Sequence, residues 1–169
     1  MERIAITGSP GAGKSTVCRN VLKHLTCTYG GMVSADIRVK GERVGFEIKD
    51  IATGKQGILA HRQGTGPRVG SYHVNLEDLN GIGVAAIRNA LNSELVVIDE
   101  IAPMEFMSPE FVKVVEEALD SDKNMLVVLH QKSSHPLAER IRREFQVYTV
   151  TKENRESLAS QIAGKINKF

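Results

Sequence analysis

The sequence predicts an α/β domain of three layers, with a mainly parallel sheet and an antiparallel β-hairpin insertion at about residues 30–59. Short β-rich runs alternate with amphipathic helical stretches along most of the chain, which is typical of strands joined by crossover helices. Residues 94–106 and 125–130 contain continuous apolar runs, as strands buried on both faces of a parallel sheet do. Within residues 30–59, the polar turns KGER and ATGK separate β-rich runs, a pattern that predicts hairpins.

The composition is that of an ordinary soluble domain. The chain has 169 residues, of which 41% are apolar, and its 22 basic and 20 acidic residues give a formal net charge of +2. No segment concentrates one sign of charge, which disfavours dedicated nucleic-acid binding. The opening residues have no secretion-signal pattern, and no apolar run approaches the roughly 18 residues that cross a bilayer, so we expect a cytoplasmic location without membrane contact. The lack of repeats and linkers predicts a single domain over residues 1–169.

The first half of the chain follows this alternation up to the hairpin insertion. We expect a short strand at Arg3–Thr7 and, after a glycine-rich segment, a helix whose apolar face is formed by Val17, Val21, Leu22 and Leu25. Residues 60–72 are rich in glycine, arginine and polar residues without periodicity, and therefore predict a long loop. Residues 76–92 predict a helix, although two glycines lower its intrinsic propensity.

The second half continues with strands and helices in turn. The strand within residues 94–106 ends in two acids, and Ser108 followed by Pro109 is the start signal of a helix. That helix has an apolar face formed by Phe111, Val114, Val115, Ala118 and Leu119. The remaining elements are a strand at 125–130, a helix at 135–145, a strand at 146–150 and a helix at 154–166.

The glycine-rich segment matches the phosphate-binding pattern G-x-x-x-x-G-K-[ST] between a strand and a helix. Glycines let the backbone approach phosphate oxygens closely, and a loop at a helix N-terminus directs several N–H groups at one anion. Lys14 is expected to reach the β- and γ-phosphates, and Ser15 to bind Mg²⁺. A glycine turn without a ligand is the alternative, which the strand and helix context disfavours. The predicted nucleotide contacts here are Gly8, Ser9, Pro10, Gly11, Ala12, Gly13, Lys14, Ser15 and Thr16.

The two acids of the second strand supply the other half of the predicted site. Asp99 ends an apolar strand that we expect to neighbour the first strand, where an acid can hold the Mg²⁺ that bridges the phosphates. Ser15 and Asp99 are therefore the predicted metal ligands. Glu100 is expected to orient and polarise a water molecule for attack on the γ-phosphorus. In the alternative interpretation, Glu100 pairs with Lys14 or an arginine and has no kinetic role. The predicted catalytic residues are Lys14, Asp99 and Glu100.

Other charged residues near the predicted site have two interpretations each. Glu105 lies either above the phosphates or at the solvated entry to the next helix. His130 ends a strand at the sheet edge where ligands bind, but a structural histidine is the favoured interpretation. Four basic residues are candidates for neutralising charge in the transition state, with a solvated surface charge as the alternative for each: Arg38, Arg62, Arg68 and Lys132.

The segment VVIDEIAPMEFMS, together with TGSPGAGKST, resembles the thermostable nucleoside-triphosphatase family, whose vertebrate members are called cancer-related nucleoside-triphosphatase and which belongs to the P-loop NTPase superfamily. The segments GGMVSADIRVKGERVGFEIKDIATG, VGSYHVNLEDL, HQKSSHP and TKENRESL extend the resemblance over nearly the whole chain. Two departures stand out. The family usually has glycine at the position of Ala102, and His-Arg-Arg or His-Arg-Lys where this chain has His130-Gln131-Lys132.

The resemblance implies a three-layer P-loop NTPase fold and a Mg²⁺-dependent hydrolase. Its substrates would be ATP, GTP, CTP, UTP and TTP, with diphosphates as poorer substrates. Broad base tolerance agrees with a site whose contacts are made to phosphates, and we expect the base near residues 149–155. The family's second nucleotide-binding segment corresponds here to Asp99, Glu100, Ile101, Ala102, Pro103, Met104, Glu105 and Phe106.

Two other functions remain open at the level of the sequence. A nucleotide or small-molecule kinase would use the same loop and could hold its acceptor at residues 60–75, but the chain offers only the short segment 130–145 as an arginine-rich lid. A nucleotide-dependent switch could dock RNA or a protein through the hairpin at 30–59 or the basic helix ERIRREF. Acceleration of ATP loss by an acceptor would favour the kinase, and nucleotide-dependent binding of RNA would favour the switch.

Overall fold

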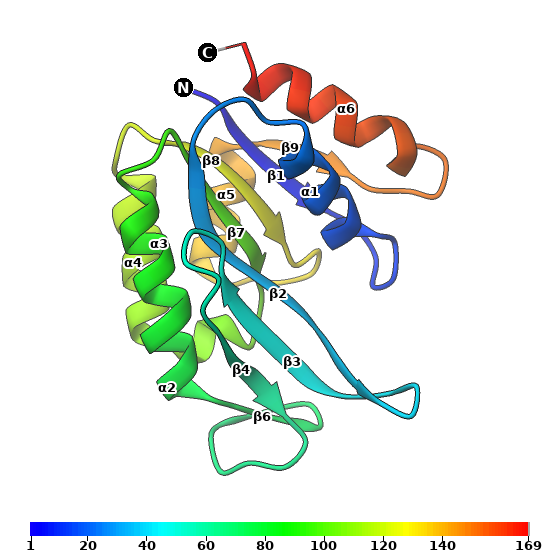
Figure 1. Ribbon diagram of the computed structural model, residues 1–169, viewed down its shortest axis with the longest axis vertical. Helices are drawn as coiled ribbons and strands as arrows, with labels where there is room; N and C mark the ends of the chain where they lie inside the picture. Colours follow the sequence, from blue (N-terminus) through cyan, green and yellow to red (C-terminus); the bar gives the residue numbers. More distant parts are fainter. Residues whose placement is uncertain (169) are drawn as a thin grey trace.

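The computed structural model describes residues 1–168, and within them the strands form one nine-stranded sheet in the order β5-β6-β4-β3-β2-β7-β8-β1-β9 (Figure 1). The strands are β1 (Arg3–Thr7), β2 (Tyr29–Val39), β3 (Glu42–Asp50), β4 (Gln56–His61), β5 (Arg68–Val69), β6 (Tyr72–Val74), β7 (Leu95–Ile101), β8 (Asn124–Leu129) and β9 (Gln146–Thr149). The helical segments are α1 (Lys14–Lys23), α2 (Leu76–Asp78), η1 (Leu79–Val84), α3 (Ala85–Ala90), η2 (Glu105–Met107), α4 (Pro109–Leu119), α5 (Pro136–Glu144) and α6 (Arg155–Ile166).

The sheet joins a parallel part to an antiparallel part through β2. Residues 29–32 of this strand pair in parallel with β7, whereas residues 32–39 pair antiparallel with β3. The predicted α/β class with an antiparallel hairpin insertion is therefore confirmed, and the sheet as a whole is mixed, with four parallel and four antiparallel strand pairs among the described residues. The hairpin is a continuation of the central sheet, because one long strand belongs to both parts, and it extends beyond the carboxyl end of β7 (Figure 1).

The strand order corrects one expectation about the site. We expected the strand that carries Asp99 to neighbour the first strand, but β8 lies between β7 and β1 and pairs in parallel with both. The continuous apolar runs of β7 and β8 indicate burial on both faces and give no information on which strand is the neighbour. The carboxyl ends of all three strands nevertheless meet at one edge of the sheet.

The structure also corrects the long loop expected at residues 60–72. Strand β4 extends to His61, and the short strands β5 and β6 form a small antiparallel hairpin beyond it. Strands of two and three residues are too short to show an alternating pattern. They exist because β6 pairs with β4, through Ala60 with Val74 and His61 with His73.

The helix expected at residues 76–92 is confirmed as the consecutive segments α2, η1 and α3. Its middle turns, η1, form a π-helix that contains both glycines. A Cβ atom at Gly83 would lie 2.7 Å from Cδ1 of Ile48 on the sheet. The glycine that lowers helix propensity here therefore permits close packing of helix against sheet.

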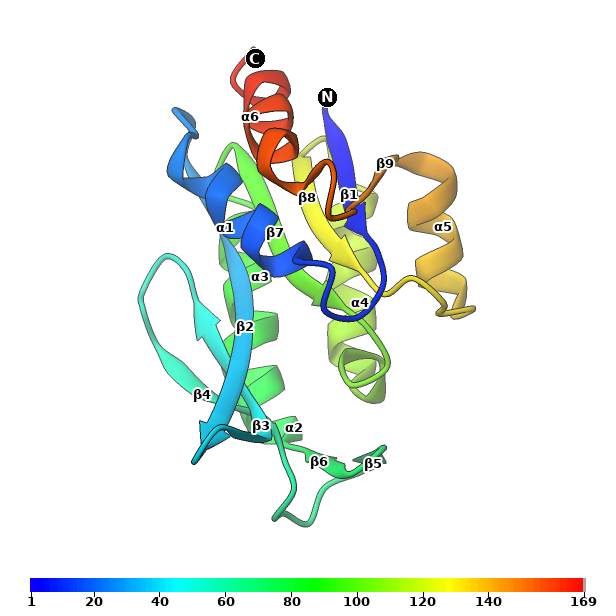
Figure 2. The same ribbon diagram turned by 90° about the vertical axis from the view of Figure 1, so that its right-hand side faces the viewer.

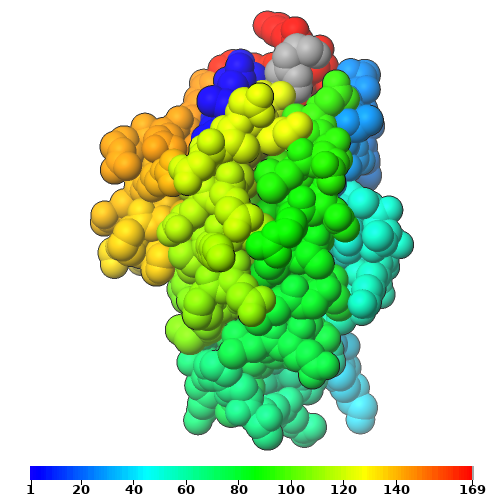
Figure 3. Space-filling model, turned by 90° about the vertical axis from the view of Figure 1, so that its left-hand side faces the viewer, coloured from blue at the N-terminus to red at the C-terminus, as the bar shows by residue number. Residues whose placement is uncertain are grey.

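Helices cover both faces of the sheet, which gives the three predicted layers (Figures 1 and 2). On one face α1 and α6 pack through a buried cluster that includes Val21 and Ile162. On the other face α3, α4 and α5 contribute Ile87, Phe111 and Ile141 to a second cluster. Burying a side chain such as Phe111 stabilises the fold by about 2 kcal/mol. Figure 3 shows this second face, where α3 and α4 lie side by side and α5 borders α4.

The start signal predicted for α4 is also present. The Ser108 side chain accepts a hydrogen bond from the backbone N–H of Phe111 at 3.0 Å, and Pro109 occupies the first turn. Among the described residues, no helix is long and apolar enough to span a bilayer.

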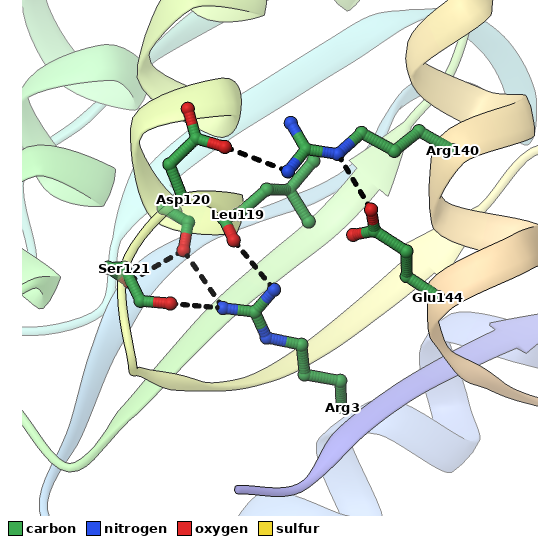
Figure 4. Close-up of polar contacts among 7 residues, drawn as sticks. Arg3, Leu119, Asp120, Ser121, Arg140 and Glu144 are labelled. Atoms are coloured by element: carbon green, nitrogen blue, oxygen red, sulfur yellow. Dashed lines mark hydrogen bonds and ion pairs between the residues drawn. The ribbon is translucent and has the colours of Figure 1, made fainter.

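The carboxyl end of α4 is held by Arg3 at the beginning of β1 (Figure 4). Its guanidinium donates to the carbonyl oxygens of Leu119 at 2.8 Å, of Ala118 at 3.3 Å and of Ser121 at 2.7 Å. The carbonyls of Ala118 and Leu119 belong to the last residues of α4, where a helix leaves acceptors without partners inside the helix, and Ser121 lies in the turn that follows. A positive charge there also interacts favourably with the helix dipole.

Replacing Arg3 by alanine is expected to lower the free energy of unfolding by about 2 kcal/mol, because hydrogen bonds from a charged donor are each worth more than neutral ones. Urea unfolding measures this loss. The matched control is Arg140→Ala, since Arg140 ion-pairs with Asp120 and Glu144 beside the same helix end and such exposed pairs contribute only about 0–1 kcal/mol (Figure 4). Equal losses in the two variants would contradict the importance of the Arg3 contacts.

Candidate active site

The glycine-rich loop connects β1 to α1 at the carboxyl edge of the parallel strands. A backbone hydrogen bond from Ala12 N to Ser9 O at 3.0 Å closes its turn. Gly13 precedes the first residue of α1 with φ 102° and ψ 25°, a left-handed conformation that favours glycine. At Gly8 a Cβ atom would lie 3.0 Å from the carbonyl oxygen of Val150. The loop is therefore packed against the residues that follow β9, and α1 begins with Lys14 and Ser15.

The acids of β7 reach the beginning of α1 even though β8 lies between the two strands. Ser15 Oγ donates a hydrogen bond to Asp99 Oδ1 at 3.1 Å. Glu100 is an extra residue in the β7–β8 ladder, because the register shifts between Asp99 and Ile101, and the Asp99–Glu100 peptide bond is cis. A bulge of this kind redirects a side chain. Glu100 Oε2 lies 3.7 Å from Lys14 Nζ, an ion pair longer than a hydrogen bond.

Burial shapes the electrostatics of this cluster. Asp99 is only 1% exposed, and desolvation, followed by the charge of Glu100, raises its pKa to about 7. The hydrogen bond from Ser15 and the charges of Arg19 and Lys14 act in the opposite direction. Burial also raises the pKa of Glu100, against the lowering effects of Lys14 and His130. The cluster therefore favours a positively charged ligand next to its carboxylates.

Glu105 is buried, so the expectation that it could lie at a solvated helix entry is wrong. It is 2% exposed at the beginning of η2, and its Oε2 is buried without a hydrogen-bond partner among the described residues. Burial, followed by the charge of Glu100, raises its pKa well above the usual value. The sequence signal for this burial is the position of Glu105 between the apolar residues Met104 and Phe106. The same local pattern also fits an acid in a polar loop, so it does not predict burial by itself.

The rest of the segment 101–106 contributes mainly packing. Ile101 and Ala102 are buried. Pro103, Met104 and Phe106 are partly buried, and the Phe106 ring stacks on that of His135 with centroids 4.0 Å apart. The side chains of Ile101 and Ala102 therefore belong to the protein interior, whereas Phe106 lies at its border.

Of the four basic residues proposed to neutralise charge, the structure brings Lys132 next to the loop. A small hollow of about 80 Å³ is lined by Gly8, Pro10, Lys14, His130, Gln131 and Lys132. Arg38 forms an ion pair with Asp36 at 2.9 Å on the hairpin, and Arg62 forms one with Glu42 at 2.8 Å. Arg68 lies in β5, the edge strand at the other end of the sheet from β1 and β9.

Two residues beside the loop were not among the individual candidates from the sequence. A Cβ atom at Gly13 would lie 3.6 Å from Cδ of Arg155, which places the beginning of α6 against the loop. The charge of Arg19, one turn along α1 from Ser15, lowers the pKa of Asp99. No local sequence pattern indicates either contact, because both depend on how the helices pack.

The oxygen atoms at this site fit a magnesium ion. Ser15 Oγ and Asp99 Oδ1 are adjacent, and Asp99 Oδ2 is buried with no partner within residues 1–168. Mg²⁺ commonly takes one or two protein oxygens together with phosphates and water. The described part of the chain has no group of three or more His, Cys, Asp or Glu side chains that could hold a metal, so such an ion would need ligands from a nucleotide or water.

Comparison with known proteins agrees with this geometry. The sequence model of a family described as NTPase matches residues 3–163. The nucleoside-triphosphatase THEP1 of Methanosarcina acetivorans is 55% identical over 169 residues, covering 98% of this chain and 97% of the relative, and that of Methanosarcina barkeri is 49% identical over 173 residues, covering 100% and 99%.

Two solved structures share the fold over nearly the whole chain. The crystal structure of THEP1 from the hyperthermophile Aquifex aeolicus has a TM-score of 0.89 and 28% identity, with 98% of this chain and 99% of that chain covered. The solution structure of a human cancer-related nucleoside triphosphatase has a TM-score of 0.81 and 29% identity, with 98% and 97% covered. The sequence matches and the shared fold together show that this chain belongs to the THEP1 family of nucleoside-triphosphatases, which are hydrolases.

Proposed function

We propose that this protein is a Mg²⁺-dependent phosphatase that releases the terminal phosphate of ATP, GTP, CTP, UTP and TTP, with diphosphates as slower substrates. The observation that carries the proposal is the contact between the loop and β7, where Ser15 donates to Asp99 and Lys14 pairs with Glu100. Two pairs of residues, separated by 84 and 86 positions in the sequence, thus form one site with two donors and two acids. The proposal treats residues 1–169 as one cytoplasmic unit.

Each residue of the site has a distinct part in the proposed reaction. The loop amides and Lys14 bind the phosphates. Ser15 and Asp99 would hold Mg²⁺, which when bound neutralises charge on the β- and γ-phosphates. Glu100 orients a water molecule and accepts its proton as the water oxygen attacks the γ-phosphorus. The bond from phosphorus to the β-phosphate oxygen breaks, giving the nucleoside diphosphate and phosphate.

The ion pair between Lys14 and Glu100 has a role in this scheme. Without nucleotide the two charges partly compensate each other in a site where Lys14 is only 13% exposed. A bound triphosphate would compete for Lys14, and Glu100 would then be free to polarise water. The pairing and the catalytic role are therefore compatible, as successive states of one residue.

Broad base tolerance follows from where the contacts lie. In this proposal the charged groups of the site, Lys14, Asp99 and Glu100, contact phosphates, metal or water, and none of them contacts the base. The segment after β9, proposed to flank the base, packs against the loop at Gly8, and its turn is held by Asn154, which accepts from Thr151 N at 2.8 Å and donates to Thr149 O at 2.8 Å. A turn held by its own hydrogen bonds offers a surface to any base without selecting one.

Phosphate release from the five triphosphates with Mg²⁺ tests the proposal. The unmodified protein is expected to act on all five with little preference, and Lys14→Ala to lower release about 100-fold, because a charge stabiliser of the transition state is lost. Lys23→Ala, at the other end of α1, is the matched control and should keep the wild-type rate. Strong preference for one base, or full activity of Lys14→Ala, would reject the proposal.

A kinase is the second candidate, supported by a cavity of about 600 Å³ at the segment where the sequence suggested an acceptor. Its lining includes His61, Thr65, His73, Asn75 and Glu77. This cavity shares no lining residue with the hollow beside Lys14, and hydrolysis is therefore favoured. Nucleotide and small-molecule acceptors added to the phosphate-release assay distinguish the two, since an acceptor of a kinase would accelerate ATP loss by orders of magnitude.

A further inference from the structure

His130 occupies a central position at the site although it belongs to neither nucleotide-binding segment. It directly follows β8, the strand between β1 and β7. The glycine-rich loop follows β1, and Glu100 lies near the end of β7. His130 therefore lies between them in the order of the sheet, and it lines the hollow beside Lys14.

Three neighbours hold His130 in place. Its backbone N–H donates to Ile101 O at 3.0 Å, and Arg142 Nη2 donates to its carbonyl oxygen at 3.0 Å. Its ring atom Nδ1 lies 3.3 Å from the backbone N–H of Lys132, which donates to it. The contacts come from β7, from α5 and from the turn after β8. The two backbone contacts hold the position of the residue, and the hydrogen bond to Nδ1 orients its ring before any ligand binds.

The contact with Lys132 also determines which ring nitrogen carries the proton. A nitrogen that accepts a hydrogen bond has no proton of its own, so the neutral imidazole carries its proton on Nε2. Among residues 1–168, no side chain or carbonyl accepts a hydrogen bond from this Nε2–H. One oriented donor therefore remains available beside Lys14 and Glu100.

We propose that His130 is a catalytic residue that donates its Nε2–H to an oxygen of the terminal phosphate of a bound nucleoside triphosphate. The inference rests on the proposed function, because it assumes that the loop binds the phosphates. The imidazole keeps its proton throughout. It stabilises the negative charge on the γ-phosphate as this group is transferred to water. It also distinguishes a triphosphate from a diphosphate, which has no γ-phosphate.

The test compares binding of ADP with binding of the non-hydrolysable β,γ-imido analogue of ATP, both measured by calorimetry with Mg²⁺. His130→Ala is expected to weaken the analogue about 10-fold and to leave ADP unchanged, because one hydrogen bond to a charged group is lost. Phosphate release from ATP should fall about 100-fold. His130→Gln should restore much of both, since its amide N–H extends to a similar distance. His24→Ala, on the surface at the end of α1, is the control and should match wild type.

Each outcome decides between a contact and a structural role. A change of the analogue-to-ADP affinity ratio in His130→Ala, with recovery in His130→Gln, supports the proposed donor. An unchanged ratio overturns it, whether both affinities fall together or neither changes, because a residue that only shapes the loop would affect ADP as well. The proposed function fails separately, and would do so if the unmodified protein bound nucleotide without releasing phosphate.

Discussion

Replacing Glu100 by glutamine is expected to lower the rate of phosphate release about 1,000-fold while nucleotide binding persists. Glutamine has nearly the same shape but cannot accept a proton from water, so the loss falls on the chemical step. The structure makes Glu100 suitable for this role because the bulge after Asp99 takes it out of the strand ladder and brings it 3.7 Å from Lys14. Steady-state release and calorimetric binding of ADP measure the two properties.

Glu110→Gln is the control for this substitution, because Glu110 is an exposed acid in the first turn of α4. It should leave both properties unchanged. If Glu100→Gln kept the wild-type rate, Glu100 would be only the ion-pair partner of Lys14, which was the alternative interpretation from the sequence. If the variant lost nucleotide binding as well as rate, its main role would be to position Lys14.

The sequence predicted the candidate site best where the site consists of residues that are consecutive in the chain. The loop and the beginning of α1 are continuous in the chain, and the predicted strand Arg3–Thr7 and helix after the loop are confirmed. Asp99 lies 84 positions from Ser15, and it was connected to the loop through the requirement for an acid near the phosphates. The structure brings the two side chains to 3.1 Å, although the roles assigned to them stay predictions.

Features that depend on packing between elements could not be predicted in the same way. An apolar run such as β8 indicates burial but not its position between β7 and β1. The close approach of η1 to the sheet at Gly83 involves Ile48, which lies in another element, and therefore has no local sequence pattern. His130 was interpreted as structural because a strand end alone does not reveal which ring nitrogen is available. That information comes from the hydrogen bond that the backbone N–H of Lys132 donates to Nδ1 of His130.

Replacing Asp99 by asparagine is expected to reduce phosphate release at least about 1,000-fold and yet to stabilise the nucleotide-free protein at neutral and alkaline pH. The charge of this buried carboxylate is costly, since burial and Glu100 raise its pKa from 3.8 to about 7. Asparagine can still accept the hydrogen bond from Ser15 but carries no charge. With chelator present, thermal unfolding of both proteins from pH 5 to pH 8 measures the difference.

The direction of the stability change in the asparagine variant follows from the difference in the Asp99 pKa between the folded and unfolded states. The folded state holds the Asp99 proton more tightly than the unfolded state does. The favourable contribution of protonated Asp99 to the free energy of unfolding is therefore fully present below about pH 4 and is lost as pH rises to about 7. The stability advantage of the asparagine variant should therefore widen by about 2 kcal/mol between pH 5 and pH 7 and then stay constant. An advantage independent of pH would show that Asp99 is not the titrating group. Asp122→Asn, exposed in the turn before β8, should follow the wild-type curve. Saturating Mg²⁺ and nucleotide should reverse the order of stability, because a charged carboxylate binds the metal more tightly than a neutral amide oxygen, and binding to the folded state alone raises its stability. A stable but inactive asparagine variant would thus show that the site retains an unfavourable buried charge for the sake of its ligand.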